Sequence, residues 1–244
     1  MITPRISVII PTYQEEEFIG TLLDQFTHEL RKRHGIEVIV SDGGSRDQTV
    51  AIARLRADRV LEAENNSKQN ISIGRNRGAR VARGDVLIFL DADVNIENAE
   101  QFFSIMGEVV LHEKTSAATC KVFVYPEEET VRDRYFHRFL NWYFWVLNAV
   151  GMGMARGECQ VIRKDVFQKL SGYNESIAAG EDYELFLRLR RLGKVSYVRS
   201  LKVFESPRRY RRYGYFRTLL LWFLNAVFIV LFRRSLVDQW KPVR

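Results

Sequence analysis

The chain alternates short runs of apolar residues with longer amphipathic stretches over its first ninety or so residues. The short runs predict strands over Ile6–Ile10, Glu37–Ser41, Arg59–Glu62 and Val86–Leu90. The stretches between them carry apolar residues at helical spacing and predict helices over Glu16–Arg33, Asp47–Leu55 and Ser72–Arg83. Strict alternation of strand and helix predicts a mostly parallel α/β sheet with right-handed crossovers, flanked by helices as in a Rossmann-like fold.

The pattern loosens in the second half of the chain. We expect helices over Ala99–His112, Lys164–Leu170 and Tyr183–Leu192, and strands over Ala117–Val124, Glu158–Ile162 and Val195–Val198. Residues 132–155 are dense in aromatic side chains. A very basic run, Arg208–Arg212, and an almost wholly apolar run, Leu219–Phe232, follow. We therefore predict one domain over residues 1–205 and a basic and apolar helical appendage over residues 206–244.

The Val86–Leu90 strand ends abruptly on two acids, Asp91 and Asp93. Its unbroken apolar run is typical of a central strand buried on both faces. Side chains alternate along a strand, so the two carboxylates are expected to point the same way at its carboxyl end, where open α/β sheets bind ligands. A hard divalent cation that carries substrate phosphates would relieve their repulsion. The alternative is a helix N-cap beside a solvated acid.

Composition adds three constraints. The 244 residues are 46% hydrophobic, which is enough for a full α/β core, and the net charge of +7 indicates an anionic partner. The two cysteines, Cys120 and Cys159, have no metal-ligand spacing and make no disulfide framework, which is typical of a reducing compartment. The first residues lead into a strand without a signal-peptide pattern. We expect a cytoplasmic protein.

Several short motifs, in order, resemble those of family 2 glycosyltransferases. They are Ile6–Glu15, Ser41–Thr49, Asp91-Ala92-Asp93, Gly157-Glu158-Cys159 with Ile162-Arg163, Gly172–Glu175 and Gly180-Glu181-Asp182. Each motif alone is a weak signal, but their order and spacing also match over roughly residues 5–200. The resemblance implies a GT-A fold, a nucleotide-sugar donor such as a UDP- or GDP-sugar, and inversion at the anomeric carbon by a hexosyltransferase-type enzyme.

The first two motifs supply candidates for donor binding. Pro11, Thr12 and Tyr13 end the first strand, where backbone groups and an aromatic ring can hold a nucleobase. Asp42 ends the second strand and can accept a ring N–H of uracil or guanine, as the matching acid does in the family, although Asp-Gly-Gly is also plain turn chemistry. Glu15 is a candidate for the ribose or a helix-start acid.

The resemblance assigns roles to residues further along the chain. It directs Arg75 and Arg77 at the donor diphosphate or base, although a solvated basic face is the alternative, above all for Arg77. Asp91 and Asp93 match the family's DXD motif, in which Asp93 ligates Mg²⁺ or Mn²⁺ and Asp91 helps to hold the ribose or the metal shell.

Asp182 is the candidate general base. An inverting transfer needs one carboxylate to take the proton from the acceptor hydroxyl, and the matching position in the family carries this role. We expect the helix dipole to keep Asp182 ionised and Glu181 to position the acceptor. The alternative for both acids is a helix-capping pair.

One departure from the family pattern lies after the last strand. Many members carry a histidine there that helps to bind the metal or diphosphate, whereas this chain has Phe204-Glu205-Ser206. The basic run that follows, above all Arg208 and Arg209, is expected to clamp the diphosphate instead, or to bind anionic lipid headgroups.

Two uncharged stretches raise the question of a membrane. Leu219–Phe232 is shorter than the roughly 18 residues of a confident span, and Phe139–Ala155 is rich in tryptophan and tyrosine of the interfacial kind. Insertion at the inner face of the cell membrane, next to a lipid-linked or glycan acceptor, is the leading interpretation. Burial in a homodimer interface and a true span remain alternatives.

Two other functions are alternatives to a metal-dependent glycosyltransferase of glycan biosynthesis. A sugar-nucleotide pyrophosphorylase would need a glycine-rich basic loop after the first strand, and Pro11–Gln14 is not one. A basic protein that binds nucleic acid or anionic lipid without catalysis would explain the charge. However, the sequence has no nucleic-acid-binding motif, and we expect no nucleic-acid partner.

Overall fold

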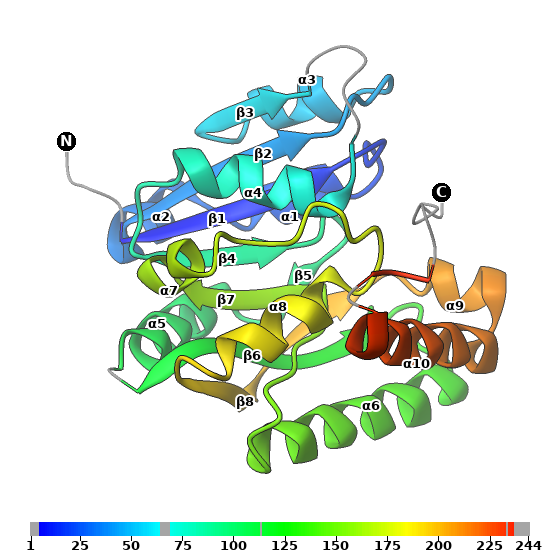
Figure 1. The fold of residues 1–244 in the computed structure, drawn as a ribbon. Coiled ribbons are helices and arrows are strands. Elements are labelled where there is room, and N and C mark those ends of the chain that lie inside the picture. The colour runs from blue at the N-terminus through cyan, green and yellow to red at the C-terminus, as the bar shows by residue number, and fades with distance from the viewer. Residues whose placement is uncertain (1–4, 64–68, 113, 233, 237–244) are drawn as a thin grey trace.

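The computed structural model describes residues 5–63, 69–112, 114–232 and 234–236, and its described strands form one sheet with helices on both faces (Figure 1). The strand order is β3-β2-β1-β4-β7-β6-β8-β5. The first half of the sheet is built from β1 (Ile6–Thr12), β2 (Ile36–Asp42), β3 (Arg59–Glu62) and β4 (Val86–Leu90), all of which run parallel. The predicted alternation and the parallel pairing are confirmed for these four strands.

Beyond β4 the sheet is mixed. The strands β7 (Cys159–Arg163) and β6 (Thr115–Val124) pair antiparallel, β7 also runs antiparallel to β4, and β8 (Lys194–Glu205) runs parallel to β6. The short β5 (Asn95–Ile96) completes the edge, antiparallel to β8. A buried strand shows the same apolar run in either direction, so the hydrophobic pattern does not reveal this reversal. The predicted last strand, Val195–Val198, is too short because β8 continues past an irregular register near Lys121.

The predicted helix over Glu16–Arg33 is wrong in one respect, since it is two helices. The first, α1 (Ile19–Asp24), ends before Thr27, whose hydroxyl accepts a hydrogen bond from the amide of Leu30 at 3.3 Å and so caps α2 (His28–His34). Gly35 ends α2 with a φ of 62°. Next come α3 (Thr49–Arg54), α4 (Ile71–Val81) and α5 (Ala99–Leu111).

The core lies on both faces of the sheet, and β4 lies at its centre. All five residues of β4 are fully buried. Val86, Ile88 and Leu90 face one apolar cluster with α1, α2 and α5, whereas Leu87 and Phe89 face the other. Burial on both faces explains why the strand reads as an unbroken apolar run, and it fixes where Asp91 and Asp93 emerge.

The aromatic-rich stretch forms a long helix, α6 (Val131–Ala149), which begins at a capping box of Thr130 and Asp133. Two shorter helices, α7 (Lys164–Lys169) and α8 (Glu181–Leu189), follow.

The predicted C-terminal appendage contains α9 (Arg208–Tyr213) and α10 (Tyr215–Phe232). It packs on the rest of the molecule, since Asn225 donates to the backbone oxygen of Ala179 at 2.8 Å and Ile229 is buried. In the described part of the chain, no helix combines the length and the apolar character that a membrane crossing needs.

Candidate active site

The carboxyl ends of β1, β2 and β4 lie at the same edge of the sheet, because these strands are parallel neighbours (Figure 1). Thr12 and Asp42 are paired in the register, and their side chains meet at 3.0 Å. The residues predicted to bind the donor from the first two motifs are therefore brought together.

Asp42 is buried, and its carboxylate holds the turn that follows β2. One oxygen accepts the amides of Gly44 and Ser45 at 2.8 Å each, and the other accepts the hydroxyls of Thr12 and Ser45. A carboxylate has about four lone-pair sites, so these four donors use them all. Asp42 therefore stabilises the turn, as the alternative interpretation held. To bind this carboxylate, a nucleobase N–H would have to replace the hydroxyl of Thr12 or Ser45.

Tyr13 and Glu15 lie beyond the end of β1. The ring of Tyr13 is 43% exposed and lies beside Gly43, as a base-stacking ring requires. Glu15 is buried, and both its carboxylate oxygens accept from Arg208, at 2.9 and 3.2 Å. The structure therefore gives Glu15 a cationic partner in place of a helix-start role.

The two acids after β4 each meet an arginine. Asp91 pairs with Arg75 at 2.9 Å, and Asp93 pairs with Arg208 at 3.0 Å. Ala92 between them is buried, whereas both acids are partly exposed, as expected for side chains that leave the strand on one side. Burial raises the pKa of Asp93. Burial also raises the pKa of Asp91, to about 7; the negative charges of Glu158 and Asp93 add to this shift, and the positive charge of Arg75 opposes it.

Arg75 lies beneath these acids with its side chain fully buried. Its guanidinium donates to Asp91, to Glu181 and to the backbone oxygen of Gly157, each at 2.9 Å. The predicted direct contact of Arg75 with the donor is therefore corrected to a supporting one, because the side chain has no exposed surface. Arg77 likewise donates to the hydroxyl of Ser41 and the backbone oxygen of Asp42, which ties α4 to the end of β2.

Asp182 and Glu181 begin α8. Glu181 is held by Arg75, whereas Asp182 accepts only the amide of Tyr183, at 2.7 Å, among the hydrogen bonds of the described residues. Burial, and then the charge of Glu181, raises the pKa of Asp182 to about 7. The prediction that the helix dipole keeps this acid well ionised is wrong, because desolvation outweighs it.

Gly157 lies between the acids that follow β4 and the acids that begin α8. A methyl group at its α-carbon would lie 3.8 Å from an oxygen of Asp91, 3.7 Å from an oxygen of Asp182 and 3.5 Å from Arg75. The DXD acid and the candidate base therefore face the same small volume, which glycine leaves open.

The acids fit a divalent cation. Asp91 and Asp93 offer hard carboxylate oxygens, burial raises the pKa of each, and a nearby buried oxygen of Glu158 has no hydrogen-bond partner among the described residues. No cluster of three potential ligands occurs in the described chain. Two carboxylates with substrate phosphates are a usual arrangement for Mg²⁺.

A buried network behind the acids was missed by the sequence reasoning. Arg156 contacts Glu158 at 2.9 Å and Tyr210 at 3.0 Å, and it also contacts Glu205. Despite its burial, Glu158 has its pKa lowered to about 2 by Arg156, whereas burial raises the pKa of Glu205 well above its usual range. The only signal in the sequence was the charged pair that flanks Gly157.

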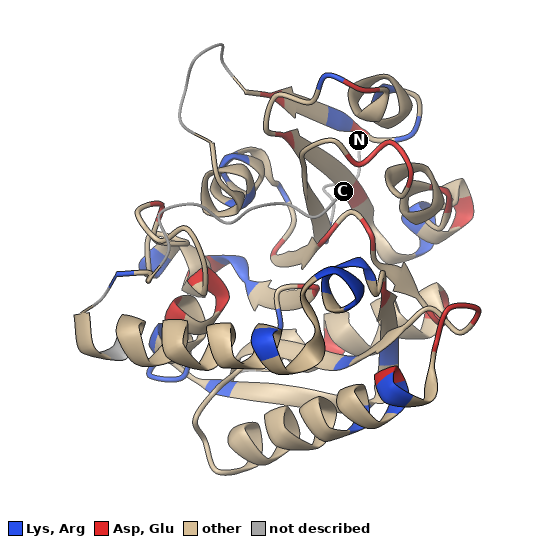
Figure 2. Cartoon of the chain, turned by 90° about the vertical axis from the view of Figure 1, so that its right-hand side faces the viewer, with Lys and Arg blue, Asp and Glu red and all other residues tan. Residues whose placement is uncertain are grey.

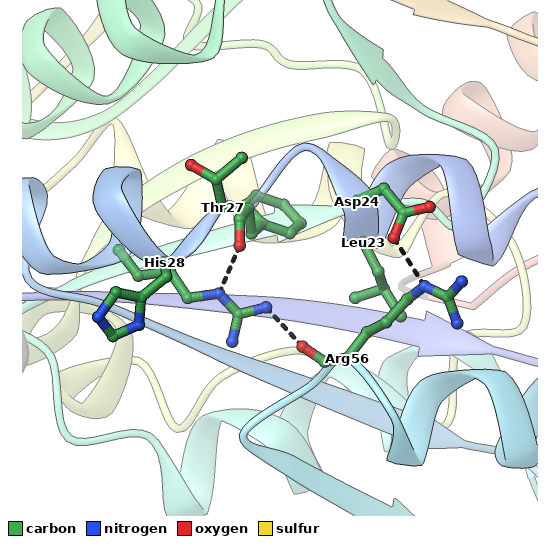
Figure 3. A pocket seen from close by; sticks show the side chains of 7 residues that line it. Leu23, Asp24, Thr27, His28 and Arg56 are labelled. Carbon is green, nitrogen blue, oxygen red and sulfur yellow. Dashed lines mark hydrogen bonds and ion pairs between the residues drawn. The ribbon is translucent and has the colours of Figure 1, made fainter.

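The hollow drawn in Figure 3 lies elsewhere, between α1, α2 and the loop after α3. It is lined by Leu23, Asp24, Thr27, His28 and Arg56, with an ion pair of 2.7 Å between Arg56 and Asp24. None of the predicted site residues lines it, and we assign it no chemistry.

The fold of this chain resembles that of several solved glycosyltransferase structures. The chain superimposes on a mannosyltransferase from Pyrobaculum calidifontis in complex with GDP-Man and Mn²⁺, with a TM-score of 0.65 at 20% identity, over 84% of this chain and 58% of that one. The superposition on glucosyl-3-phosphoglycerate synthase from Mycobacterium tuberculosis has a TM-score of 0.62 at 17% identity, and it covers 97% of this chain and 90% of that one. The fold is therefore that of GT-A glycosyltransferases.

The chain belongs to glycosyl transferase family 2, whose profile matches residues 7–171. The Bacillus subtilis "Probable glycosyltransferase YdaM" is 25% identical over 201 residues, which are 78% of this chain and 47% of that protein. A Pseudomonas fluorescens undecaprenyl-phosphate 4-deoxy-4-formamido-L-arabinose transferase is 30% identical over 130 residues, 46% of this chain and 37% of that protein. The chain thus spans less than half of these two relatives. The predicted family is confirmed, and it disfavours both alternative functions.

Proposed function

We propose that this protein is an inverting, divalent-metal-dependent glycosyltransferase that moves a sugar from a nucleotide-sugar donor to an acceptor hydroxyl. The observation that carries the proposal is the juxtaposition of Asp91 and Asp182 around Gly157, with Arg75 holding Asp91 and Glu181 from below. A donor-side acid and a base that face one small volume are what a single-displacement transfer needs.

The donor is proposed to bind along the carboxyl ends of β1, β2 and β4. Tyr13, Pro11, Thr12 and Asp42 surround the base, and Glu15 and Asp91 lie near the ribose. Arg208 and Arg209 supply positive charge, since Arg208 contacts Asp93 and Arg209 lowers the pKa of that acid against its burial. Asp93 and Asp91 would hold Mg²⁺ or Mn²⁺, which neutralises charge on the departing diphosphate. Structures of fold neighbours contain Mn²⁺ with GDP-Man or UDP.

Asp182 is proposed to act as general base. Its carboxylate takes the proton of the acceptor hydroxyl as the hydroxyl oxygen bonds to the anomeric carbon and the bond from that carbon to the diphosphate breaks. A pKa of about 7 suits this task, because about half of the molecules carry the ionised carboxylate at neutral pH and that carboxylate accepts a proton readily. Glu181, fixed by Arg75, is proposed to position the acceptor.

The acceptor is proposed to be a lipid-linked or membrane-proximal glycan. One relative, by its name, transfers a sugar to undecaprenyl phosphate, and this supports the class of acceptor. The predicted place at the inner face of the cell membrane stays a prediction, and a homodimer stays an alternative.

Release of nucleoside diphosphate from a panel of UDP-, GDP-, dTDP- and CDP-sugars tests this function. Wild-type protein with Mn²⁺ and extracted lipid-linked glycans is expected to release the diphosphate of one donor, and Asp182→Asn is expected to release almost none. Exposed Asp165→Asn is the matched control and should retain the wild-type rate. Full turnover by Asp182→Asn would remove Asp182 as the base.

A further inference from the structure

Exposed large apolar side chains concentrate on two helices, α6 and α10. Six of them define what we call the α6–α10 surface: Tyr135, Phe139 and Trp142 on α6, and Phe216, Phe223 and Leu231 on α10. All are more than half exposed, and on each helix they recur at intervals of three, four, seven or eight residues, so they form a stripe along one side. Apolar exposure at this density marks an interaction site.

The two helices run alongside each other in both views (Figures 1 and 2). They are joined near their first turns, where the hydroxyl of Tyr215 donates to Asp133 at 2.6 Å and the ring of Phe136 lies 5.0 Å from that of Tyr215. The stripes therefore belong to one rigid part of the molecule.

The exposed charges that α6, α9 and α10 themselves carry have one sign. Among α6, α9 and α10, the only acid is Asp133, which is buried and paired with Arg211 at 2.7 Å. Arg132, Arg138, Arg212 and Arg217 are exposed, and none of the four has a carboxylate partner in the described chain. The acids of the loop before α6, residues 127–129, lie past the end of the helix (Figure 2), and Glu129 pairs with Arg134.

We propose that the α6–α10 surface docks onto an anionic lipid bilayer. Aromatic and aliphatic side chains edged by arginines match the boundary between headgroups and acyl chains. A second copy of the same surface would bring the exposed arginines against one another, which disfavours an isologous dimer. In this arrangement both helices would lie in the plane of the interface, with their apolar stripes toward the acyl chains.

Docking there would place the active site at the bilayer. Arg208, at the start of α9, contacts Asp93, while Asn225 and Ile229 of α10 lie against Gly180, where an added methyl group would come within 2.6 Å of both. Gly180 directly precedes Glu181 and Asp182. The acceptor part of this inference rests on the proposed function: its hydroxyl would be presented in the headgroup layer.

Co-sedimentation with vesicles of phosphatidylcholine alone and of phosphatidylcholine with phosphatidylglycerol tests the docking. The wild type is expected to sediment with the anionic vesicles at low salt, weakly with neutral ones, and less as salt rises. Trp142→Glu on α6 and Phe223→Glu on α10 are each expected to lower the partition coefficient about tenfold or more, since each puts a charge in place of exposed apolar area that the bilayer would bury. Leu55→Glu, at a site 82% exposed at the end of α3, is the matched control and should bind like the wild type.

Three results would overturn the proposal: wild-type protein that stays in the supernatant with anionic vesicles at low salt, helix variants that bind as well as Leu55→Glu, or loss of binding in the variants of only one helix. A stable dimer in sedimentation velocity that Phe223→Glu dissociates would assign the surface to a second copy instead. Thermal stabilisation by nucleoside diphosphates, measured on the same variants without vesicles, reports the donor site separately. It is expected to be unchanged, so failure of docking and failure of the proposed function are distinguishable.

Discussion

Arg208 and Asp93 form an ion pair of 3.0 Å between α9 and the end of β4, more than one hundred residues apart in the chain. The same guanidinium nitrogen also contacts Glu15 at 2.9 Å, and the guanidinium lies over the ring of Phe18. A cation from the C-terminal segment thus neutralises the acid that is assigned to the metal. A metal ion and Arg208 would therefore compete for Asp93.

This competition predicts opposite effects of Arg208→Gln on metal binding and on transfer. Removing the guanidinium frees Asp93, so Mn²⁺ is expected to bind the protein several-fold more tightly without donor, as measured by calorimetric titration. Transfer is expected to slow by about tenfold or more, because a charge-assisted contact with the diphosphate is lost. Arg33→Gln, which removes an exposed arginine paired with Glu100 on another face of the protein, is the control. Weaker Mn²⁺ binding by Arg208→Gln would mean that the arginine supports the metal site.

The raised pKa of Asp182 predicts the pH dependence of turnover. The base must be deprotonated, so the rate at saturating substrate should rise with pH and reach half of its plateau near pH 7. An unperturbed aspartate would place this limb near pH 4. The pH profile of kcat between pH 5 and 9, at saturating donor and Mn²⁺, measures it. A flat profile across pH 6–8 would contradict the assignment.

Gly157→Ala is predicted to separate activity from stability. The added methyl group would lie 3.5–3.8 Å from Arg75, Asp182 and Asp91, which is ordinary contact distance, so the fold should lose less than about 1 kcal/mol of its free energy of unfolding. The methyl group fills the space that the reacting groups share, and turnover should fall about 100-fold.

Gly20→Ala is the control for that substitution, since its methyl group would meet only Ile52, at 3.7 Å. Urea unfolding of both variants measures the change in stability, and diphosphate release by both measures the change in turnover. Wild-type turnover in Gly157→Ala would show that the reaction takes place elsewhere.

Arg75→Met is predicted to destabilise the protein. Arg75 has no exposed side-chain surface and pairs with both Asp91 and Glu181, so its removal leaves two uncompensated acids. The expected loss in the free energy of unfolding at pH 7 is about 3–5 kcal/mol, measured by urea denaturation. The loss should shrink at lower pH as the acids take up protons. A loss below about 1 kcal/mol would contradict the structural role.

The sequence predicted those parts of the fold and site that depend on local pattern. Val86–Leu90 was correct to the residue because burial on both faces leaves an unbroken apolar run. The break before Thr27 was missed because its capping bond is a local event inside an otherwise continuous helical pattern. The direction of β7 depends on its partners and leaves no trace in its own residues.

The site shows the same division. Asp91 and Asp182 could be named from motifs, whereas the burial of Arg75 beneath them and the pairing of Arg208 with Asp93 depend on elements that meet only in the folded chain. The pKa of Asp182 could not be predicted either. The dipole of its own helix can be inferred from the local sequence, whereas the desolvation that raises the pKa depends on segments that surround Asp182 only in the folded chain.

The most direct test of the proposed function is thermal unfolding in the presence of UDP, GDP, dTDP and CDP, each with and without Mn²⁺. The wild type is expected to be stabilised by one diphosphate only when Mn²⁺ is present, by about 2.7 kcal/mol at a hundred times Kd. Asp93→Asn should abolish this stabilisation and Asp182→Asn should retain it. Equal stabilisation of the wild type and Asp93→Asn, or none by any nucleotide, would contradict a metal-dependent donor site at the end of β4.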